Sequence, residues 1–358
     1  MPAPSEFVAS VVRAEICALK AYEVADAAGL VKLDAMENPY PLPQDVRAKI
    51  AAAVADVPIN RYPDGGAKGV KSALREAFGI GEGFGIVLGN GSDELIQMLT
   101  VAVAAPGATI MAPDPSFVMY RMNAVYAGVS FVGVPLAADF SLDPKAMHEA
   151  IEREKPALIF LAYPNNPTGN LFAPDHIDAV LRAAPGLVVI DEAYHAFAGT
   201  SYLPRLREFP NLVVMRTVSK IGMAGLRLGY AIGAREWTAE LEKIRQPYNL
   251  NALTQAVAPV LLREDALLAD QAATIKAERA RVAAALAALP GVQVFPTHTN
   301  FVLARVPDAT RWFERLREAR ILVKNLHGWH PLLANCLRIT VGTPEENSAV
   351  LAALPTNR

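Results

Sequence analysis

The chain has 358 residues, of which 52% are hydrophobic and 20% are charged, and its formal net charge is −2. This length fits one large domain with a smaller one, and the hydrophobic content can bury a sizeable core. The near-neutral charge gives no electrostatic reason to expect nucleic acid as a partner, and no apolar run reaches membrane-spanning length.

The N-terminal twenty residues contain Arg13, Glu15 and Lys20 and so lack the uninterrupted apolar core of a signal peptide. The two cysteines, Cys17 and Cys336, are too few for a disulfide framework and show no metal-ligand spacing. The sequence therefore predicts reduced thiols, no metal, no membrane association and a cytoplasmic location.

Residues 1–36 are expected to form an N-terminal arm that belongs in part to a small domain. The next segment, Glu37-Asn38-Pro39-Tyr40-Pro41, is expected to be extended, because its prolines disfavour a helix.

Seven short apolar runs, separated by helical stretches, follow within residues 37–250. The runs are rich in Val, Ile, Leu and Phe with little polar alternation, as is typical of strands covered on both faces. They predict a large α/β domain with a mostly parallel seven-stranded sheet. The runs are 85–88, 109–112, 129–134, 157–162, 187–190, 212–217 and 229–232.

Residues 251–358 are predicted to form a small C-terminal α/β domain. A long amphipathic helix over about 261–289 precedes strands at 292–295 and 300–306, a helix at 308–320, and strands at 321–324 and 336–341. A final helix should begin after Thr343, because proline follows as the first helical residue and Glu346 stands three residues after the threonine cap.

Ligands of open parallel sheets bind beyond the carboxyl ends of the strands, so the residues after each run are the candidates for a site. The first run leads into Gly89-Asn90-Gly91-Ser92-Asp93-Glu94, where glycines and a helix N-terminus could bind a phosphate. Alone, this motif is more often a tight turn with Ser92 as the cap. Glu94 stands where a dinucleotide fingerprint needs its third glycine, which argues against a nicotinamide or flavin enzyme.

Three later runs end in motifs that each have an ordinary explanation as a turn, a helix cap or a solvated surface group. They are Tyr163-Pro164-Asn165-Asn166-Pro167-Thr168-Gly169, Asp191-Glu192-Ala193-Tyr194, and Thr217-Val218-Ser219-Lys220.

Pyridoxal phosphate is a cofactor that needs all of these groups together. Lys220 can supply the amine for its aldehyde, and a buried Asp191 can keep its pyridine nitrogen protonated. Asn166 and Tyr194 can donate hydrogen bonds to its phenolic oxygen, and Phe117 can stack on its ring. The residues expected to hold its phosphate are Gly91, Ser92, Asp93, Ser219 and Arg227.

Over nearly its whole length the sequence resembles the fold-type-I, class-II-like aminotransferases, which depend on pyridoxal phosphate. Within them it is most similar to the histidinol-phosphate aminotransferase family of histidine biosynthesis. Besides the three motifs above, the resemblance rests on Arg61-Tyr62-Pro63 and on Cys336-Leu337-Arg338-Ile339-Thr340-Val341-Gly342-Thr343.

The resemblance implies roles for individual residues. Lys220 would be the Schiff-base lysine and the proton shuttle between the two substrate carbons. Tyr62 would reach the cofactor phosphate of the other subunit, so that the enzyme would be an obligate homodimer. The residues implied to bind substrate are Arg338, Tyr40 and Lys324.

Two positions depart from the family pattern. Arg227 follows Lys220 by seven residues, where eight are common, and Lys324 stands near a position where a second phosphate-binding arginine is common. Lysine keeps the positive charge but lacks the bidentate fork of arginine.

The implied reaction converts L-histidinol phosphate and 2-oxoglutarate into imidazole-acetol phosphate and L-glutamate, and it is reversible. An aromatic amino acid aminotransferase and a phosphothreonine-type decarboxylase remain alternatives, because a shared fold does not decide the reaction. A regulatory module fused to a DNA-binding domain is disfavoured, since no basic stretch is present.

Overall fold

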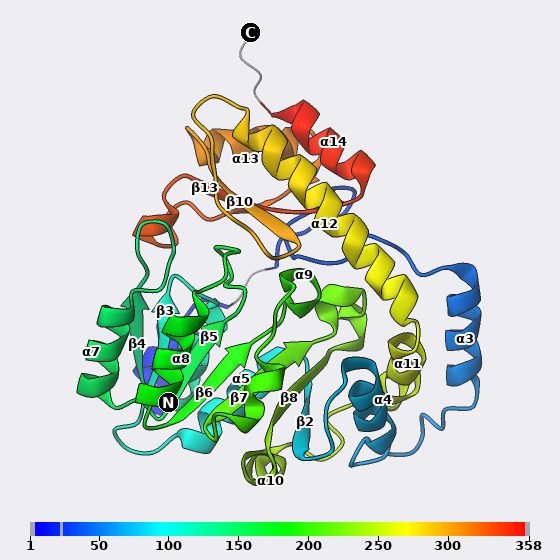
Figure 1. Ribbon diagram of the computed structural model, residues 1–358, viewed down its shortest axis with the longest axis vertical. Coiled ribbons are helices and arrows are strands. Elements are labelled where there is room, and N and C mark those ends of the chain that lie inside the picture. The colour runs from blue at the N-terminus through cyan, green and yellow to red at the C-terminus, as the bar shows by residue number, and fades with distance from the viewer. Residues whose placement is uncertain (1–3, 22–23, 355–358) are drawn as a thin grey trace.

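The computed structural model describes residues 4–21 and 24–354, and in it a large body carries a smaller one (Figure 1). The large body contains a seven-stranded sheet with helices on both faces. The smaller body contains a four-stranded sheet that packs beside a long helix.

The large sheet has the strand order β2-β8-β7-β6-β5-β3-β4. Strands β7, β6, β5, β3 and β4 are parallel, while β8 runs antiparallel to both of its neighbours, so β2 points in the same direction as β7. The prediction of a mostly parallel seven-stranded sheet is confirmed. The strands are β2 (Phe84–Asn90), β3 (Thr109–Asp114), β4 (Ser130–Pro135), β5 (Leu158–Ala162), β6 (Leu187–Asp191), β7 (Leu212–Thr217) and β8 (Leu228–Ala234).

The direction of β8 follows from the short connection that precedes it. β7 ends at Thr217 and β8 begins at Leu228, whereas a parallel crossover needs a dozen or more residues and usually a helix. The 3-10 turns η2 (Ser219–Ile221) and η3 (Ala224–Leu226) fill the connection. Lys220 lies in η2 and is therefore held at the carboxyl end of β7.

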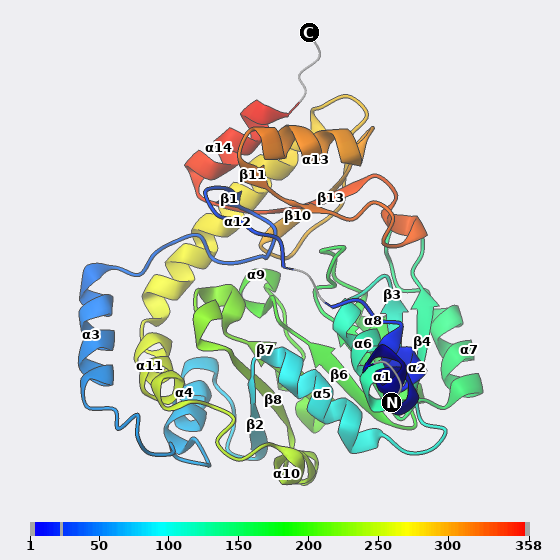
Figure 2. The ribbon, with the colours of Figure 1, turned by 180° about the vertical axis from the view of Figure 1, so that it is seen from behind.

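Helices cover both faces of the sheet, which explains why β5, β6 and β7 are buried along their whole length. Side chains of α5, α6 and α10 pack in one apolar core, and those of α4, α7 and α8 pack in another. In Figure 2, α5 and α6 lie in front of the sheet. The bounds are α4 (Lys68–Phe78), α5 (Ser92–Val103), α6 (Val118–Ala127), α7 (Pro144–Glu154), α8 (Pro174–Ala183) and α10 (Arg235–Ile244).

The N-terminal helices pack on the outside of the large body. The Arg13 guanidinium donates hydrogen bonds to the backbone carbonyls of Val125 and Tyr126, at 3.0 and 2.6 Å, and so fastens α2 to the end of α6. The other elements of this body are α1 (Pro4–Val11), α2 (Ala14–Cys17), α3 (Gln44–Ala55), α9 (His195–Ala198), η1 (Leu203–Arg207) and α11 (Ala252–Leu262).

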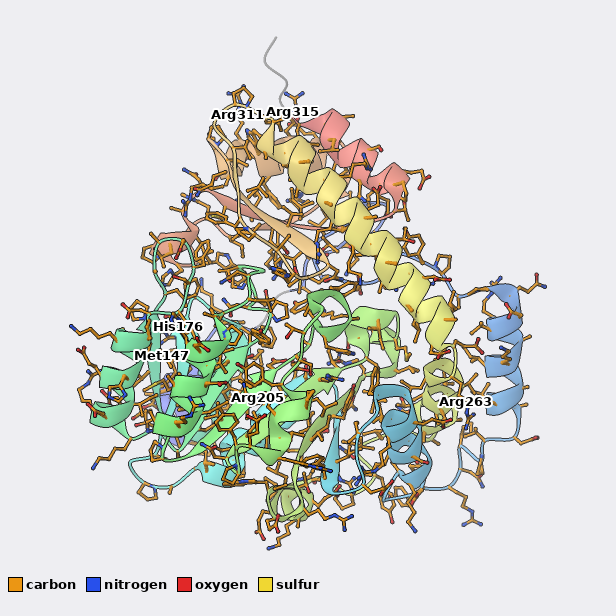
Figure 3. All side chains as sticks on the ribbon, in the orientation of Figure 1. Met147, His176, Arg205, Arg263, Arg311 and Arg315 are labelled. Atoms are coloured by element: carbon orange, nitrogen blue, oxygen red, sulfur yellow. The ribbon has the colours of Figure 1, made fainter. Side chains whose placement is uncertain are left out.

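The smaller body is built on an antiparallel sheet of order β12-β13-β10-β9 and on a separate parallel pair, β1 with β11. On α13, Arg311 and Arg315 lie at the outer surface (Figure 3), while Trp312 and Leu316 are buried. The bounds are β1 (Val31–Lys32), α12 (Asp265–Ala287), β9 (Gln293–Val294), β10 (Phe301–Arg305), α13 (Ala309–Glu318), β11 (Ile321–Leu322), β12 (Lys324–Asn325), η4 (Pro331–Leu333), β13 (Cys336–Thr340) and α14 (Pro344–Ala353).

Several local predictions are confirmed and two are wrong. The segment 37–41 is extended, and α14 begins with the predicted capping box of Thr343 and Glu346. The long helix expected over about 261–289 is present as α12, but its predicted start is four residues too early. Residues 261–262 end α11, which packs on α3 and α4, and the chain turns at residues 263–264 into α12 beside the small sheet. The strand expected over 321–324 is split between β11 and β12, which pair with different strands.

The predicted domain boundaries at residues 36/37 and 250/251 stay predictions. β1 pairs with β11, so part of the N-terminal arm joins the small body. Leu261 and Leu262 of α11 belong to the core of the large body, so this helix packs with residues that precede the predicted boundary at 250/251.

At Gly229, β8 lies close against the N-terminus of α5. A Cβ atom there would lie 2.5 Å from the backbone nitrogen of Ser92 and 2.6 Å from the carbonyl carbon of Gly91. Because the obstacle is backbone, we expect Gly229→Ala to lower the free energy of unfolding by about 1–3 kcal/mol. Urea unfolding would measure it.

Gly225→Ala is the matched control. A Cβ at Gly225, in the same connection, would have no heavy atom within 4 Å, so we expect its unfolding free energy to change by less than about 1 kcal/mol. Equal unfolding midpoints for the two variants would contradict the close approach of β8 and α5.

Candidate active site

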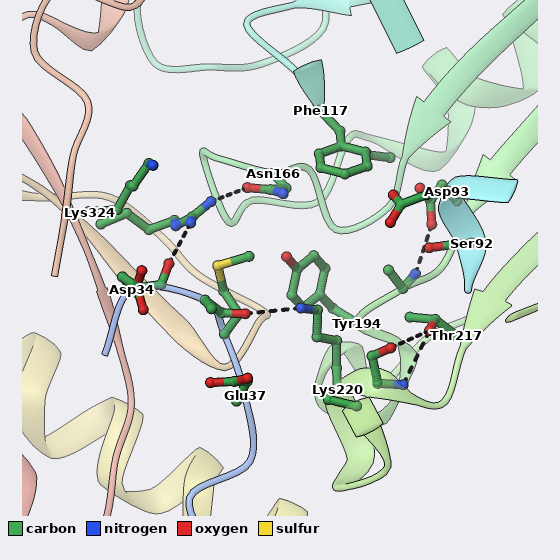
Figure 4. A pocket seen from close by; sticks show the side chains of 18 of the residues that line it. Asp34, Glu37, Ser92, Asp93, Phe117, Asn166, Tyr194, Thr217, Lys220 and Lys324 are labelled. Carbon is green, nitrogen blue, oxygen red and sulfur yellow. Dashed lines mark hydrogen bonds between the residues drawn. The ribbon is translucent and has the colours of Figure 1, made fainter. Parts of the chain in front are cut away.

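A cavity of about 350 Å³ lies at the carboxyl ends of β5, β6 and β7, beneath the smaller body (Figure 4). The ends of the three strands, the N-terminus of α5, the segment 34–37 and the small sheet all contribute to its wall. Its polar and aromatic lining residues are Asp34, Glu37, Ser92, Asp93, Phe117, Tyr120, Asn166, Asp191, Tyr194, Thr217, Ser219, Lys220, Arg227, Lys324 and Arg338.

Lys220 projects into this cavity from η2. Its ammonium donates a hydrogen bond to the backbone carbonyl of Ala35, at 3.1 Å, which joins it to the N-terminal segment (Figure 4). Burial lowers the pKa of Lys220 to about 8, and the positive charge of Arg338 acts in the same direction. About a tenth of the amine is therefore uncharged at pH 7.

Asp191 closes β6 at the floor of the cavity and is 5% exposed. Its carboxylate accepts hydrogen bonds from the Tyr120 hydroxyl at 2.7 Å and from the backbone N–H of Ala193 at 3.0 Å. Neither donor carries a charge, so burial prevails and raises the pKa of Asp191 to about 6. A cation placed against this carboxylate would be strongly favoured.

Arg338, on β13, joins the small sheet to the large body. Its guanidinium donates to Asn166 Oδ1 at 2.7 Å and to the backbone carbonyl of Asp34 at 2.8 Å. Because Asn166 uses its side-chain oxygen in this contact, its amide NH2 group is the part that can donate to a ligand.

Two aromatic side chains close the remaining sides. Phe117 precedes α6 and makes an edge contact with Tyr120, with ring centroids 5.7 Å apart. Tyr194, which follows β6, is buried with its ring against Phe301, and burial raises the pKa of its hydroxyl above the ordinary value. The hydroxyl therefore stays protonated and can act as a donor.

One end of the cavity has the composition of an anion site. The N-terminus of α5 meets the hydroxyls of Thr217 and Ser219, whose oxygens lie 2.8 Å apart. The Arg227 guanidinium donates to the Asp93 carboxylate at 3.2 Å. Gly91 permits the close approach of Arg227, since a Cβ there would lie 2.4 Å from the Arg227 Nη2 atom.

These residues fit pyridoxal phosphate on the chemistry of the donor set. A buried carboxylate with uncharged partners, an amine of lowered pKa, and the hydroxyl–amide–guanidinium cluster match the cofactor's ring nitrogen, aldehyde and phosphate. The structure brings all but three of the predicted site residues, Gly91, Tyr40 and Tyr62, to the cavity wall, and Gly91 lies directly behind that wall as the cap of α5. Their individual roles stay predictions.

Tyr40 and Tyr62 lie away from the cavity of their own chain. Tyr40 is half-buried beside the small body and its hydroxyl is near Glu278 of α12, whose charge adds to burial in raising the pKa of the tyrosine. Tyr62 is 80% exposed and stacks on Tyr248 with ring centroids 4.4 Å apart.

Two contributions to the site were not predicted. Tyr120 lies in the first turn of α6, three residues after Phe117, which caps this helix. Residues three apart lie on the same side of a helix, so this spacing could have indicated that Tyr120 faces the site as Phe117 does. Glu192 and Arg216 form a fully buried ion pair at 2.8 Å directly behind the site. Arg216 interrupts an otherwise apolar strand, and such a charge needs a buried partner.

His195, to which we assign no role, lies outside the cavity lining. Its ring makes an edge contact with Phe78, and burial together with Arg216 lowers its pKa to about 3, so it is uncharged. Within the described residues, no helix is long and apolar enough to cross a membrane, and no group of three acidic, histidine or cysteine side chains could hold a metal ion. Cys17 and Cys336 are free thiols, and a cytoplasmic location stays a prediction.

Comparison with known proteins places this site in a family. The family model for class I and II aminotransferases matches residues 28–354. The chain belongs to the class I and II aminotransferases. A solved histidinol-phosphate aminotransferase from Sinorhizobium meliloti, in complex with pyridoxal-5'-phosphate, has a TM-score of 0.86 and 27% identity to it, covering 97% of both chains. The predicted aminotransferase fold is confirmed.

Curated relatives of this aminotransferase are similar over nearly all of its length. A histidinol-phosphate aminotransferase from Chromobacterium violaceum is 55% identical over 347 residues, which are 97% of this chain and 98% of that protein. One from Cupriavidus pinatubonensis is 53% identical over 96% of this chain and 95% of its own length. A threonine-phosphate decarboxylase from Porphyromonas gingivalis shares the fold, with a TM-score of 0.75 at 21% identity.

The raised pKa of Asp191 predicts a pH-dependent stability of the cofactor-free chain. The folded chain holds the proton on the Asp191 carboxyl more tightly than the unfolded chain does. Ionised Asp191 therefore destabilises the fold fully above pH about 6, and this cost disappears below pH about 4, where the carboxyl is protonated in both states. We expect Asp191→Asn to be more stable than the wild type by on the order of 2 kcal/mol at pH 7.5, and equally stable at pH 4.

Urea unfolding of both proteins at several pH values between 4 and 7.5 would measure this difference. Asp270→Asn is the control: Asp270 is exposed on α12, so the difference in unfolding free energy between this variant and the wild type should stay small at every pH. A stability difference that does not change with pH would show that Asp191 ionises normally.

Proposed function

We propose that this aminotransferase binds pyridoxal 5'-phosphate at Lys220 and exchanges the amino group between L-histidinol phosphate and 2-oxoglutarate, giving imidazole-acetol phosphate and L-glutamate. The observation that carries the proposal is the similarity to curated proteins of that activity. Eight relatives that are 50–55% identical over 96–98% of this chain are histidinol-phosphate aminotransferases.

The charge distribution of the site supports a phosphate-bearing substrate. Lys324 on β12 is the cross-strand partner of Arg338 on β13, and both side chains line the cavity. Like charges opposite each other destabilise a sheet, and the pKa of Lys324 is lowered by burial and by Arg338. A phosphate monoester with two negative charges would neutralise both cations, whereas one carboxylate would neutralise one.

When bound, pyridoxal phosphate would supply an aldehyde for the incoming amine and a protonated ring that withdraws electrons. Asp191 would hold the positive charge of the ring nitrogen, and the Tyr120 hydroxyl would keep the carboxylate oriented toward it. Tyr194 and the amide of Asn166 would donate to the phenolic oxygen, and Ser219, Arg227 and the N-terminus of α5 would hold the phosphate.

Lys220 has the properties of both the attaching amine and the proton carrier. Its pKa of about 8 leaves part of the amine uncharged near neutral pH, as an amine nucleophile requires. Freed by the substrate amine, the same nitrogen would act as the base that accepts the proton of the amine-bearing substrate carbon and as the acid that gives this proton back. Its hydrogen bond to Ala35 would hold the amine within the cavity.

The proposed reaction can be followed through the visible absorption of the loaded enzyme. L-Histidinol phosphate should bleach the band and 2-oxoglutarate should restore it, because each substrate completes one half of the exchange. Lys220→Ala should lower turnover by on the order of 10³-fold or more, while some cofactor binding remains.

Each other outcome points to a different conclusion. Bleaching by phenylalanine or tyrosine but not by histidinol phosphate would make the chain an aromatic amino acid aminotransferase. Release of carbon dioxide without need of an oxoacid would make it a decarboxylase. Normal turnover by Lys220→Ala would overturn the role of that lysine.

We propose further that the enzyme is a homodimer in which Tyr62 completes the site of the partner subunit. Tyr62 is 80% exposed, and its ring stacks on Tyr248, which is itself 43% exposed. Two stacked aromatic rings on the surface are suited to a contact with a partner subunit.

Subunit complementation tests this arrangement. Tyr62→Ala and Lys220→Ala should each be strongly impaired, and refolding an equal mixture should restore about a quarter of wild-type activity, because half of the dimers are hybrids with one intact site each. A mixture no more active than its parents would show that Tyr62 acts within its own chain or not at all. Val101→Ala, at an exposed position on α5, mixed with Lys220→Ala is the control for refolding yield.

A further inference from the structure

A second cavity of about 460 Å³ adjoins the first and shares Phe117, Asn166, Lys324 and Arg338 with it. Its opposite wall comes from the loop 326–335 of the smaller body, which carries Trp329. Trp329 is 54% exposed. This loop lies outside the motifs at the strand ends and outside the motif at residues 336–343.

The loop that carries Trp329 is held firmly at several points. Leu326 and Leu333 are buried in the core, and the backbone N–H of Trp329 donates to the Leu326 carbonyl at 3.1 Å. The His330 ring accepts a hydrogen bond from the backbone N–H of Leu332 at 3.1 Å and so caps η4. The exposed indole therefore stands on a well-anchored turn.

The indole faces the ammonium of Lys324, whose Nζ atom lies 4.7 Å from the ring centroid. This geometry is that of a cation–π interaction. It opposes the repulsion between Lys324 and its cross-strand partner Arg338. Arg338 is held by Asn166 and by the backbone of Asp34, whereas Lys324 has a flexible stem that could turn its charge into solvent.

We propose that Trp329 is a positioning residue that holds the Lys324 ammonium beside Arg338 and thereby sets the preference of the enzyme for amines that carry a phosphate over amines that carry a carboxylate. The proposal rests on the proposed function and deepens it. A lysine ammonium lacks the bidentate geometry of an arginine guanidinium, and the face of the Trp329 indole fixes the position of the Lys324 ammonium instead. A phosphate places two negative charges on one group, whereas each carboxylate of L-glutamate carries only one, so the benefit of Trp329 falls on the phosphate.

The test compares both amino donors in single-turnover reactions of the loaded enzyme, followed by absorption. Trp329→Leu removes the aromatic face and Trp329→Phe keeps one. Lys324→Met and the double variant Lys324→Met/Trp329→Leu complete a mutant cycle. Trp237→Phe, on α10 and outside both cavities, is the matched tryptophan control.

We expect Trp329→Leu to weaken apparent binding of L-histidinol phosphate relative to L-glutamate by about three- to tenfold, with the limiting rate nearly constant. Trp329→Phe should recover part of the loss. When Lys324 is already methionine, adding Trp329→Leu should weaken apparent binding of L-histidinol phosphate, relative to L-glutamate, by less than about twofold. Trp237→Phe should behave as the wild type.

Equal weakening of both donors by Trp329→Leu, or an undiminished loss in the Lys324→Met background, would overturn the proposal. If the wild type does not react with histidinol phosphate, the proposed function fails, and the role of Trp329 is then read from inhibition by inorganic phosphate against the amine that the enzyme does use. Weaker phosphate inhibition in Trp329→Leu would support the positioning role, and unchanged inhibition would reject it.

Discussion

The burial of opposite charges at the edge of one parallel sheet is the constraint on which the site depends. Asp191 ends β6 in a dry environment that raises its pKa, while Lys220 follows β7 in an environment that lowers the pKa of its amine. Both shifts have burial as their main cause, so each group is held in a costly state that a ligand can relieve. A cofactor with a basic ring nitrogen and an aldehyde would relieve both costs at once. The apo fold is therefore less stable than its core alone would permit, and cofactor binding should recover that stability.

The site is completed by segments that are distant in the sequence. Arg338 reaches down from β13 to Asn166 of the large body and to the backbone of Asp34, and Lys220 bonds to the neighbouring carbonyl of Ala35. The N-terminal segment is thus fixed by Lys220 and by Arg338 together. Since β1 of the same segment pairs with β11, a movement of the smaller body would be transmitted directly to the contacts of Lys220. In the proposed function, this segment would link an anion bound at Arg338 to the amine of Lys220.

Much of the large body could be predicted because its signals are local. Seven apolar runs gave seven strands, and the polar residues that follow them meet in one cavity since the ends of parallel strands share an edge. The start of α12 at Asp265 could not be predicted, because the residues before it pack on α3 and α4 as the end of α11, and propensity does not decide this. Tyr120 was missed for a similar reason: its hydroxyl matters only because the fold brings α6 over the end of β6. In the proposed homodimer Tyr62 would act in the site of the partner subunit, an arrangement that no pattern within a single chain specifies.

The lysine at position 324 shows how a local departure can be balanced by its surroundings. A lysine in place of an arginine weakens directional binding of phosphate and leaves its charge mobile. The structure surrounds this lysine with Arg338, which repels it, with the acidic Asp34, whose charge acts on its pKa in the opposite direction, and with the indole of Trp329. Only the last of these constrains direction as well as charge, because a cation is attracted to the face of the ring and not to its edge. The specificity of the anion site therefore depends on the loop that presents the indole as much as on the cations themselves.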